Sequence, residues 1–560
     1  MASRPSEHPP GSLLLRLGLS LLSLCLPLST HLPAGHAQVT TNITSSGLNT
    51  QVGAPTTLSS GKINYDITGG TRAGTNLFHS FGQFSVATNN IANFLNETNL
   101  STANIIGRVT GGSVSNIYGT IQTTGFGSAN LYLLNPAGVI FGPGASLNIG
   151  GSFHVSTADY LKFANGEKFF VDPSNPNTAL SVDPPAAFGF TSLSPAAIAL
   201  QGSSLQVPTG QTLSVVGGDL TMTGTPTTSS TTPTLGAAGG VVNIISVASA
   251  GEVVMPTSGV PTDLQLVSFE QLGTIDVSQN ARIQTSGDPA GTIVIRGGRF
   301  YLDASRLVST TGDFDSGSID IRTTGEMALS NSATISATSS GFGRAGDITL
   351  EAGGNMTVTN GVFIQNVASS FGDAGTISMT SPDLIINGSF LLAYTTGFGN
   401  AGSVLLDVGT LALTNGSPIY ASTYSYGQGG LVRINATDSV SLSGSSSILT
   451  ITEWTGNAGN ISITAPTLTL DGASLLAYTI DAGNAGNVSL NVGSLSMTNG
   501  AQDVSSYRTG QGGLVDINAT ELVTIADGYI TALAFATGDA GTIAITSPAL
   551  TLDGSYLLAY

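Results

Sequence analysis

The stretch Asn457-Ala-Gly-Asn-Ile-Ser-Ile463 decides the fold of this chain. It joins a small turn around one glycine to a segment in which apolar and polar residues alternate. Alternation with a period of two is typical of a strand with one buried face. The same unit occurs at Asp288-Pro-Ala-Gly-Thr-Ile-Val-Ile295, Arg344-Ala-Gly-Asp-Ile-Thr-Leu350 and Asp373-Ala-Gly-Thr-Ile-Ser-Met379. A recurring turn and strand predict a repetitive all-β fold.

The anchoring glycine of this unit recurs every 26 to 29 residues, at Gly291, Gly317, Gly346, Gly375, Gly402, Gly430, Gly459, Gly486, Gly513 and Gly541. A longer repeat lies over the short one, because Leu-Leu-Ala-Tyr begins at Leu391, Leu475 and Leu557, three short units apart each time. We expect the tyrosines of this longer repeat to lie in the core or in a stacking ladder rather than against a ligand: Tyr394, Tyr478 and Tyr560.

A unit of about 28 residues with two or three short strands fits one coil of a right-handed parallel β-helix, a solenoid in which each coil packs on its neighbours. Asn-Gly and Asp-Gly pairs such as Asn360-Gly361 and Asp471-Gly472 separate the strands and tolerate the positive φ of sharp turns. A β-propeller is the alternative, but its repeats are usually longer and carry Trp or Asp signatures, and this chain has 1 Trp. The sequence therefore predicts the solenoid.

The composition excludes several classes of protein. Only 9% of residues are charged and the formal net charge is −18, with 15 Lys and Arg in 560 residues. Nucleic-acid binding needs clustered cations, which the sequence lacks, so no nucleic-acid partner is expected. Hydrophobic residues at 41% are enough to build a core. An acidic exterior with little charge is compatible with life outside the cell.

The N-terminus resembles an export signal, which we assign to residues 1–37. Arg4 precedes an apolar stretch from Leu13 to Leu28, and small residues at Gly35 and Ala37 fit a signal-peptidase site. A membrane anchor is the weaker alternative, because a span needs about 20 uninterrupted apolar residues. The chain's 1 Cys lies within this segment, so the mature protein is expected to contain no thiol and no disulfide.

Two regions follow the signal. Residues 38–270 are β-patterned but less periodic, and they include a Thr/Ser/Pro run from Gly224 to Pro233 that is typical of a surface loop. Residues 271–560 carry the regular repeats and are expected to form the β-helical shaft. Leu557 to Tyr560 match the start of another unit, so we expect the chain to be a fragment of a longer protein.

The N-terminal region resembles the secretion domain of filamentous-haemagglutinin-like exoproteins, which leave the cell by two-partner secretion. The resemblance covers residues 38 to about 270 and is carried by four stretches: Asn76 to Phe84, Asn104 to Gly112, Ser115 to Ile121, and Asn130 to Gly142. The last stretch contains a sequence similar to the family's Asn-Pro-Asn-Gly-Ile motif, in Asn135, Pro136, Ala137, Gly138 and Val139. Ala137 replaces the family's second Asn, and the family's other motif, Asn-Pro-Asn-Leu, has no clear copy.

The resemblance implies a capped β-helical secretion domain that an outer-membrane β-barrel transporter recognises in the periplasm. The partner would thread the chain to the cell surface or the medium. The motif turn would then be a structural feature, with direct transporter contact as the alternative. The resemblance says how the protein leaves the cell but not which receptor it binds.

The chemistry-bearing residues do not suggest catalysis, a cofactor or a metal site. The histidines after the signal are His79, expected to be a satisfied histidine among phenylalanines, and His154. Neither has the Gly-x-Ser-x-Gly elbow of a hydrolase nearby. Two Gly-x-Gly-x-x-Gly matches, at Gly341–Gly346 and Gly397–Gly402, sit at the repeat turn, so we interpret them as β-helix corners rather than dinucleotide loops.

An adhesin is the function that these features favour. The first alternative is a carrier shaft for a C-terminal toxin or effector that lies beyond this sequence. The second is a β-helical polysaccharide lyase or hydrolase, which needs clustered carboxylates. The densest acidic group, Asp313, Asp315, Asp320 and Glu326, forms no ladder from repeat to repeat, so a protein that is not an enzyme is expected.

Overall fold

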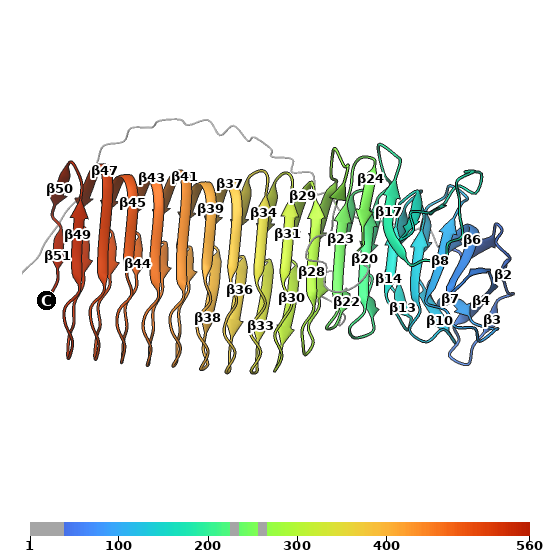
Figure 1. Cartoon of the computed structure of the whole chain (residues 1–560), viewed down its shortest axis with the longest axis horizontal. Helices are drawn as coiled ribbons and strands as arrows, with labels where there is room; N and C mark the ends of the chain where they lie inside the picture. Colours follow the sequence, from blue (N-terminus) through green and yellow to red (C-terminus); the bar gives the residue numbers. More distant parts are fainter. Residues whose placement is uncertain (1–38, 225–233, 256–265) are drawn as a thin grey trace, which may run out of the picture. The chain divides into compact units, whose positions relative to one another are not determined.

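The computed structural model describes residues 39–224, 234–255 and 266–560. The assigned export signal and most of the Thr/Ser/Pro run therefore lie outside the described residues. Within those ranges every regular element is a β-strand, and no helix is long and apolar enough to cross a membrane. Residues 39–560 form a β-solenoid of about 17 turns with coils of about 28 residues, which confirms the predicted all-β solenoid. Figure 1 shows the coils side by side.

Two long sheets run along the solenoid. The larger has 27 strands: β1 (Asn42–Ser45), β5 (Thr71–Ala73), β6 (Asn76–Ser85), β8 (Asn104–Val109), β9 (Ser115–Ile117), β11 (Asn130–Leu134), β12 (Val139–Phe141), β14 (Phe153–Ser156), β18 (Ile198–Gln201), β20 (Thr212–Gly217), β21 (Leu220–Thr223), β23 (Val241–Ser246), β26 (Thr274–Ser278), β28 (Thr292–Gly297), β29 (Arg299–Asp303), β31 (Ile319–Thr323), β32 (Met327–Ser330), β34 (Ile348–Ala352), β35 (Met356–Thr359), β37 (Ile377–Asn387), β39 (Val404–Thr414), β41 (Leu431–Ser443), β43 (Asn460–Asp471), β45 (Val488–Thr498), β47 (Leu514–Ala526), β49 (Thr542–Thr546) and β50 (Leu550–Asp553).

The second long sheet has 13 strands: β19 (Leu205–Val207), β22 (Thr234–Ala237), β27 (Arg282–Gln284), β30 (Arg306–Thr311), β33 (Thr334–Ser339), β36 (Phe363–Ala368), β38 (Phe390–Thr395), β40 (Pro418–Tyr420), β42 (Ser447–Leu449), β44 (Ser474–Leu476), β46 (Ala501–Asp503), β48 (Tyr529–Thr531) and β51 (Tyr556–Leu558).

Two smaller sheets belong to the N-terminal half of the solenoid. One has six strands: β2 (Thr50–Val52), β3 (Thr56–Thr57), β4 (Ile63–Gly69), β7 (Asn90–Leu95), β10 (Thr120–Thr124) and β13 (Ser146–Asn148). The other, which we call the cover sheet, is antiparallel and has five strands: β15 (Tyr160–Phe163), β16 (Lys168–Phe170), β17 (Pro185–Phe190), β24 (Gly251–Val254) and β25 (Leu266–Val267).

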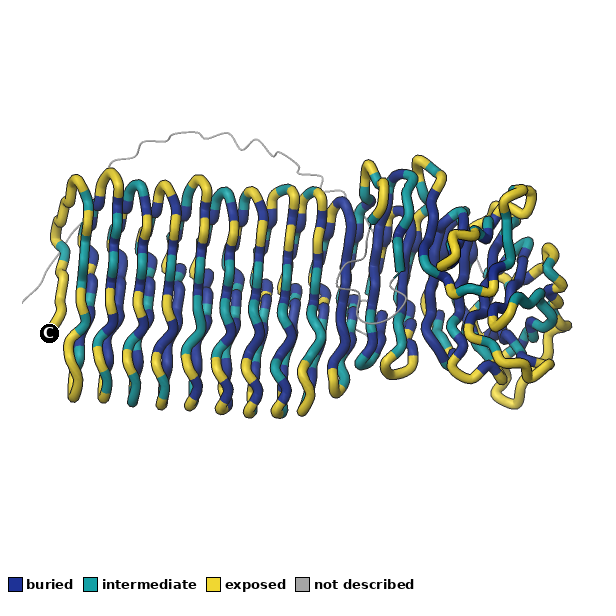
Figure 2. The backbone as a smooth tube through the Cα atoms, viewed as in Figure 1, coloured by how far each residue is buried: buried dark blue, intermediate teal, exposed yellow. Residues whose placement is uncertain are grey.

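Alternation along each shaft strand builds the core. In β43 the inward residues, such as Ile461 and Ile463, are buried, while intervening residues face outward, as Figure 2 shows along the coils. The next coil adds β45 in parallel register, so Ile463 stacks beside Leu490. Burying one such side chain stabilises a fold by about 1.5–3 kcal/mol, and every coil repeats the contribution.

The anchoring glycines are required by close contact between coils. A Cβ on Gly459 would lie 1.8 Å from the carbonyl oxygen of Gly430 in the preceding coil, and one on Gly486 would lie 1.7 Å from that of Gly459. No real Cβ tolerates such a distance. The periodic glycine therefore reflects the coil spacing, and the two Gly-x-Gly-x-x-Gly matches lie in these turns between strands, as predicted.

The outward face of the larger sheet changes along the solenoid. In its N-terminal half this face carries Phe78, Ile106, Tyr132 and Val216, and a second apolar cluster forms between them and cover-sheet residues such as Phe188. The covered apolar face ends after Val294, because the register partner of Val294 in the next coil is the charged residue Asp320. Beyond that point the same column continues as Thr349 and Ser378, which face outward.

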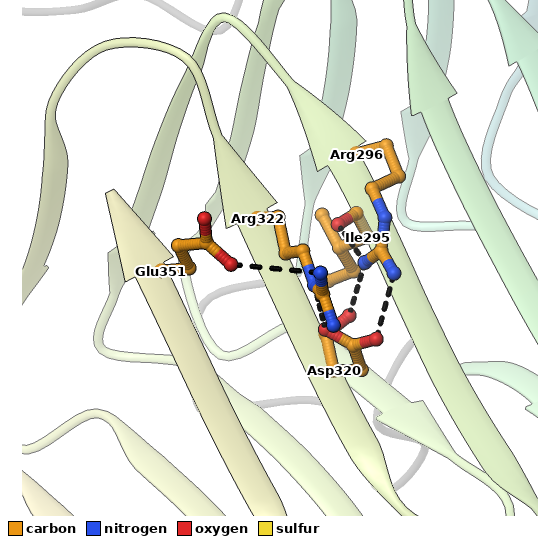
Figure 3. Close-up of polar contacts among 5 residues, drawn as sticks. All are labelled: Ile295, Arg296, Asp320, Arg322 and Glu351. Carbon is orange, nitrogen blue, oxygen red and sulfur yellow. Dashed lines mark hydrogen bonds and ion pairs between the residues drawn. The ribbon is translucent and has the colours of Figure 1, made fainter. Parts of the chain in front are cut away.

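A charged network marks this change (Figure 3). The Arg296 side chain is 7% exposed and donates to the Asp320 carboxylate at 2.7 Å and to the Ile295 carbonyl at 3.0 Å. Arg322 donates to the same carboxylate at 3.0 Å and lies 3.6 Å from the Glu351 carboxylate. Because Asp320 neutralises a nearly buried guanidinium, the apolar covered face can end without an unpaired buried charge.

Candidate functional site

The five motif residues lie together in one turn between β11 and β12. The Gly138 N–H donates to the Asn135 carbonyl at 3.0 Å, which closes the turn. Proline fixes the φ that the second position of such a turn requires, and glycine is favoured at the fourth. Gly138 has a φ of 109°, in the region that favours glycine. The sequence Asn-Pro-Ala-Gly thus matches the local geometry at each position.

The Asn135 side chain fixes this turn to the coils beside it. It is fully buried, and its amide donates to the Ser113 carbonyl at 3.0 Å and to the Ser115 hydroxyl at 2.9 Å. Its side-chain oxygen accepts from the Ala137 N–H at 3.0 Å. A buried amide with three partners is satisfied, and loss of those bonds leaves several polar groups unpaired.

The remaining motif residues divide into buried and surface positions. Gly138 and Val139 are buried, and Val139 pairs in parallel with Ser115 on one side and Ile198 on the other. Pro136 and Ala137 are partly exposed. Only the backbone N–H of Ala137 is used by the turn, which explains in structural terms why this position accepts a residue other than asparagine.

An open hollow of about 400 Å³ lies beside the turn. Asn135, Pro136 and Ala137 line it from the motif, and Asp159, Asp172 and Thr191 line it from the connections of the cover sheet. Pockets of this size are typical of ligand and partner sites. The motif turn is therefore part of an accessible surface as well as a structural element.

Both carboxylates of the hollow are held by local hydrogen bonds. The Asp159 carboxylate accepts from the Thr191 N–H at 2.6 Å and from its hydroxyl at 2.8 Å. Asp172 accepts from the Ser174 hydroxyl at 2.7 Å and N–H at 2.9 Å, and these bonds hold the pKa of Asp172 below its usual value. The two carboxylates give the hollow an acidic rim.

Sequence reasoning located the motif but missed its partners. Ser113 and Ser115 lie about 20 residues before Asn135, and Asp159 and Asp172 lie on connections of a sheet that has no repeat signature. Only the stacking of coils brings these segments together. The one local signal in the sequence for these partners is the turn-forming stretch that starts at Asp172, where the Asp172 carboxylate accepts from the Ser174 N–H.

The two histidines are buried structural residues. His79 is 1% exposed, lies 3.3 Å from the Thr50 hydroxyl and contacts the rings of Phe81 and Phe94. His154 lies 3.0 Å from the Ser214 hydroxyl and stacks on a tyrosine ring. Burial lowers the pKa of His79 to about 4, with a contribution from Arg72, and the pKa of His154 to about 3. Both rings are neutral at physiological pH.

The acidic residues considered for catalysis have separate structural partners. Asp313 and Asp315 accept backbone N–H groups of the next coil, at 3.3 and 2.8 Å. Asp320 pairs with two arginines, and Glu326 pairs with Tyr301. Among the described residues, no three His, Cys, Asp or Glu side chains are grouped so as to hold a metal ion.

In comparisons with known proteins, residues 40–295 match the family model described as "TPS secretion domain". Among solved structures, the chain is similar to the HMW1 secretion domain from Haemophilus influenzae, with 13% identity and a TM-score of 0.38, over 83% of this chain and 99% of that one. It is also similar to a filamentous hemagglutinin secretion domain, with 16% identity and a TM-score of 0.26, over 65% of this chain and 99% of that one. No curated protein matches the chain.

Proposed function

We propose that this chain acts outside the cell as an adhesin. Its residues 40–295 match the two-partner-secretion domain, which indicates an exoprotein exported from the cell with an outer-membrane transporter partner. The observation that carries the proposal is the shaft itself. Its outward strand positions are mostly short polar residues, such as Thr349 and Ser378 and, further along the same column, Ser462 and Ser489, so repeated coils present a long surface with little charge.

A shaft of this kind supports adhesion for a physical reason. Each coil contacts only its neighbours, so the fold lengthens by adding coils without any new core. The exterior can then vary while the inward ladder of Ile463 and Leu490 is maintained. Such a surface suits the display of binding positions along its length.

We also propose that the motif turn contributes to recognition by the transporter. Pro136 and Ala137 are its exposed residues, and they line the acidic hollow together with Asp159 and Asp172. A basic partner surface would complement that rim. Asn135, Gly138 and Val139 would act indirectly, because they are buried and hold the turn in place.

The boundary between the secretion domain and the shaft was expected at residue 270. We propose that it lies nearer Arg296, because the family match ends at residue 295 and the covered apolar face ends after Val294. The Arg296–Asp320 pair then closes the secretion domain and starts the polar shaft.

The adhesin proposal is tested by displaying the full chain on cells that also make its transporter partner. Adhesion to a panel of surfaces and host cells is compared with that of cells in which only the partner is made. We expect adhesion that rises with the amount of surface chain and is blocked by purified chain. Equal adhesion of the two cell types, with the chain present at the surface, would refute the proposal.

A further inference from the structure

Exposed aromatic rings form a ladder along one turn of the shaft. The ring centroids of Phe342 and Phe371 lie 4.8 Å apart with planes at 8°, and those of Phe371 and Phe398 lie 4.9 Å apart at 9°. Phe398 stacks on Tyr426 at 5.2 Å and 6°. These separations are close to the spacing of paired strands. Because each inner ring is covered on both faces by its neighbours, this part of the ladder offers only ring edges to a ligand.

The ladder is interrupted one coil later. Trp454 is tilted by 56° from Tyr426, and the row of Phe398 and Tyr426 continues in the next coils as Thr455 and Ala482, which have no ring. Tyr507 then stacks on Phe535 in the next coil, at 5.0 Å and 10°. On the side away from Phe535, Tyr507 lies beside the coil of Ile480 and forms an edge-to-face pair with Tyr478, with centroids 5.4 Å apart and planes at 76°. The row of stacked rings is therefore broken between Tyr426 and Tyr507.

An open hollow of about 520 Å³ lies at this interruption. Pockets of this size accommodate small organic ligands or units of a longer one. Trp454 is 52% exposed and Tyr507 is 43% exposed, so both rings are accessible. The hollow is lined by Glu453, Trp454, Ile480, Asp481, Tyr507 and Arg508.

The polar groups of the hollow are held in position. The Arg508 guanidinium lies 2.7 Å from the Asp481 carboxylate, and the Arg508 side chain is 71% exposed. The Tyr507 hydroxyl donates to the buried Asp503 carboxylate at 2.7 Å, and burial and this bond raise the pKa of Tyr507. The tyrosine ring is thus fixed before any ligand binds, which lowers the entropic cost of binding.

We propose that this hollow binds an uncharged glycan, an inference that rests on the proposed adhesin function and names its ligand class. The apolar face of a sugar ring packs on the exposed ring of Trp454, beside the exposed part of Tyr507. Sugar hydroxyls donate to the carboxylates of Glu453 and Asp481 and accept from Arg508, through charge-assisted bonds.

Charge selects among glycans. The hollow has two carboxylates and one guanidinium, and the whole chain has a formal net charge of −18. A uronate, sulfate or sialate would therefore be repelled, whereas a neutral sugar ring would not. The predicted ligand is a polysaccharide or glycoconjugate rich in neutral hexose or N-acetylhexosamine.

Trp454 itself supplies the measurement, because the chain contains 1 Trp. The full secreted chain is titrated with neutral oligosaccharides of glucose, galactose, mannose and N-acetylglucosamine, and separately with heparin fragments and with choline, while indole fluorescence is followed. We expect a saturable change with at least one neutral oligosaccharide. No saturable change with any of them, or a change with heparin or choline only, would overturn the proposal.

Ile480→Phe sharpens the test, because the larger side chain, in register with Tyr507, takes up space in the hollow that Ile480 lines. We expect the dissociation constant for the neutral oligosaccharide to rise by at least about tenfold, with an unfolding temperature no lower than that of the parent chain. Phe371→Leu is the matched control, a ladder substitution outside the hollow, and it should leave binding unchanged. Unchanged binding in Ile480→Phe would overturn the assignment of the site.

The result of this titration can be distinguished from the result of the cell-adhesion test. A saturable titration by a chain whose cells do not adhere would refute only the adhesin proposal. Adhesion by a chain that no neutral oligosaccharide titrates would refute only the glycan site.

Discussion

The side chains of Asn135 and Ser115, from two successive coils, are joined by a buried hydrogen bond of 2.9 Å. This bond connects the turn between β11 and β12 to β9 of the preceding coil. The motif turn therefore depends on coil stacking for its shape. Substitution of its buried residues is expected to change stability more than substitution of its partly exposed residues.

Asn135→Ala should destabilise the secretion domain. The substitution removes three hydrogen bonds from a fully buried position and leaves the Ser115 hydroxyl and Ser113 carbonyl without this partner. We expect a loss of about 2–4 kcal/mol in the free energy of unfolding, measured by urea denaturation. Ala137→Asn is the control and should change stability by less than about 0.5 kcal/mol, since that side chain is partly exposed. Equal stability of Asn135→Ala and the parent chain would contradict the described turn.

Gly459→Ala should disrupt the shaft. The added Cβ would lie 1.8 Å from the Gly430 oxygen, so two coils must move apart. We expect a loss of about 3 kcal/mol or more in urea denaturation. Gly472→Ala provides the comparison, because its φ is 61° but no atom lies within 4 Å of the added Cβ. That variant should lose only about 1–2 kcal/mol. A smaller effect at Gly459 than at Gly472 would argue against the coil spacing.

Gln502→Leu should stabilise the shaft. Gln502 is fully buried, and its side-chain oxygen has no hydrogen-bond partner. Its register partners in the adjacent coils are the apolar residues Leu475 and Ile530. Replacing an unsatisfied amide by leucine should add about 1–2 kcal/mol, seen as a higher midpoint in thermal or urea unfolding. The matched variant Leu475→Gln should lower the midpoint; a decrease in both variants would show that Gln502 has partners in solution.

Stability should fall in mild acid because of His154. Its pKa is about 3 in the folded chain, against about 6.5 when unfolded. Between these values the unfolded state binds the extra proton, so stability is complete above pH 6.5 and decreases toward pH 3. We expect a loss on the order of 2 kcal/mol between pH 7 and pH 4.5 from this residue.

The measurement is urea denaturation at the two pH values for the parent chain and His154→Phe, which keeps a ring beside Tyr132. The variant should lose less stability on acidification, although His79 continues to contribute because its own pKa is lowered to about 4. An identical pH dependence in both chains would mean that His154 is accessible to protons in the folded state.

The repetitive part of the fold was predictable because its cause is local. Alternation in a segment such as Asn457 to Ile463 fixes which residues face inward, and the period of the glycines fixes the coil length. The hand of the coil stays a prediction. The cover sheet was not anticipated, because its strands pair antiparallel across long separations, as Phe188 does with Val253, and have no period.

The aromatic ladder shows a second limit. The sequence drew attention to Tyr394 and Tyr478, which instead form edge-to-face pairs with Tyr424 and Tyr507. The stacked rungs vary between Phe and Tyr, and the Tyr507–Phe535 pair lies in a different row, so identity at a fixed repeat position misses them. Only the three-dimensional stacking shows that the row of rings ends at Tyr426, where Thr455 and Ala482 follow in the next coils.

Export tests the central claim most directly. The full chain is produced with and without its outer-membrane transporter, and the amount in the medium and on the cell surface is measured against the amount in the periplasm. The account predicts export that requires the partner and that fails for Asn135→Ala while Ala137→Asn is exported. Export without the partner, or periplasmic retention beside a transporter that exports its own substrate, would contradict it.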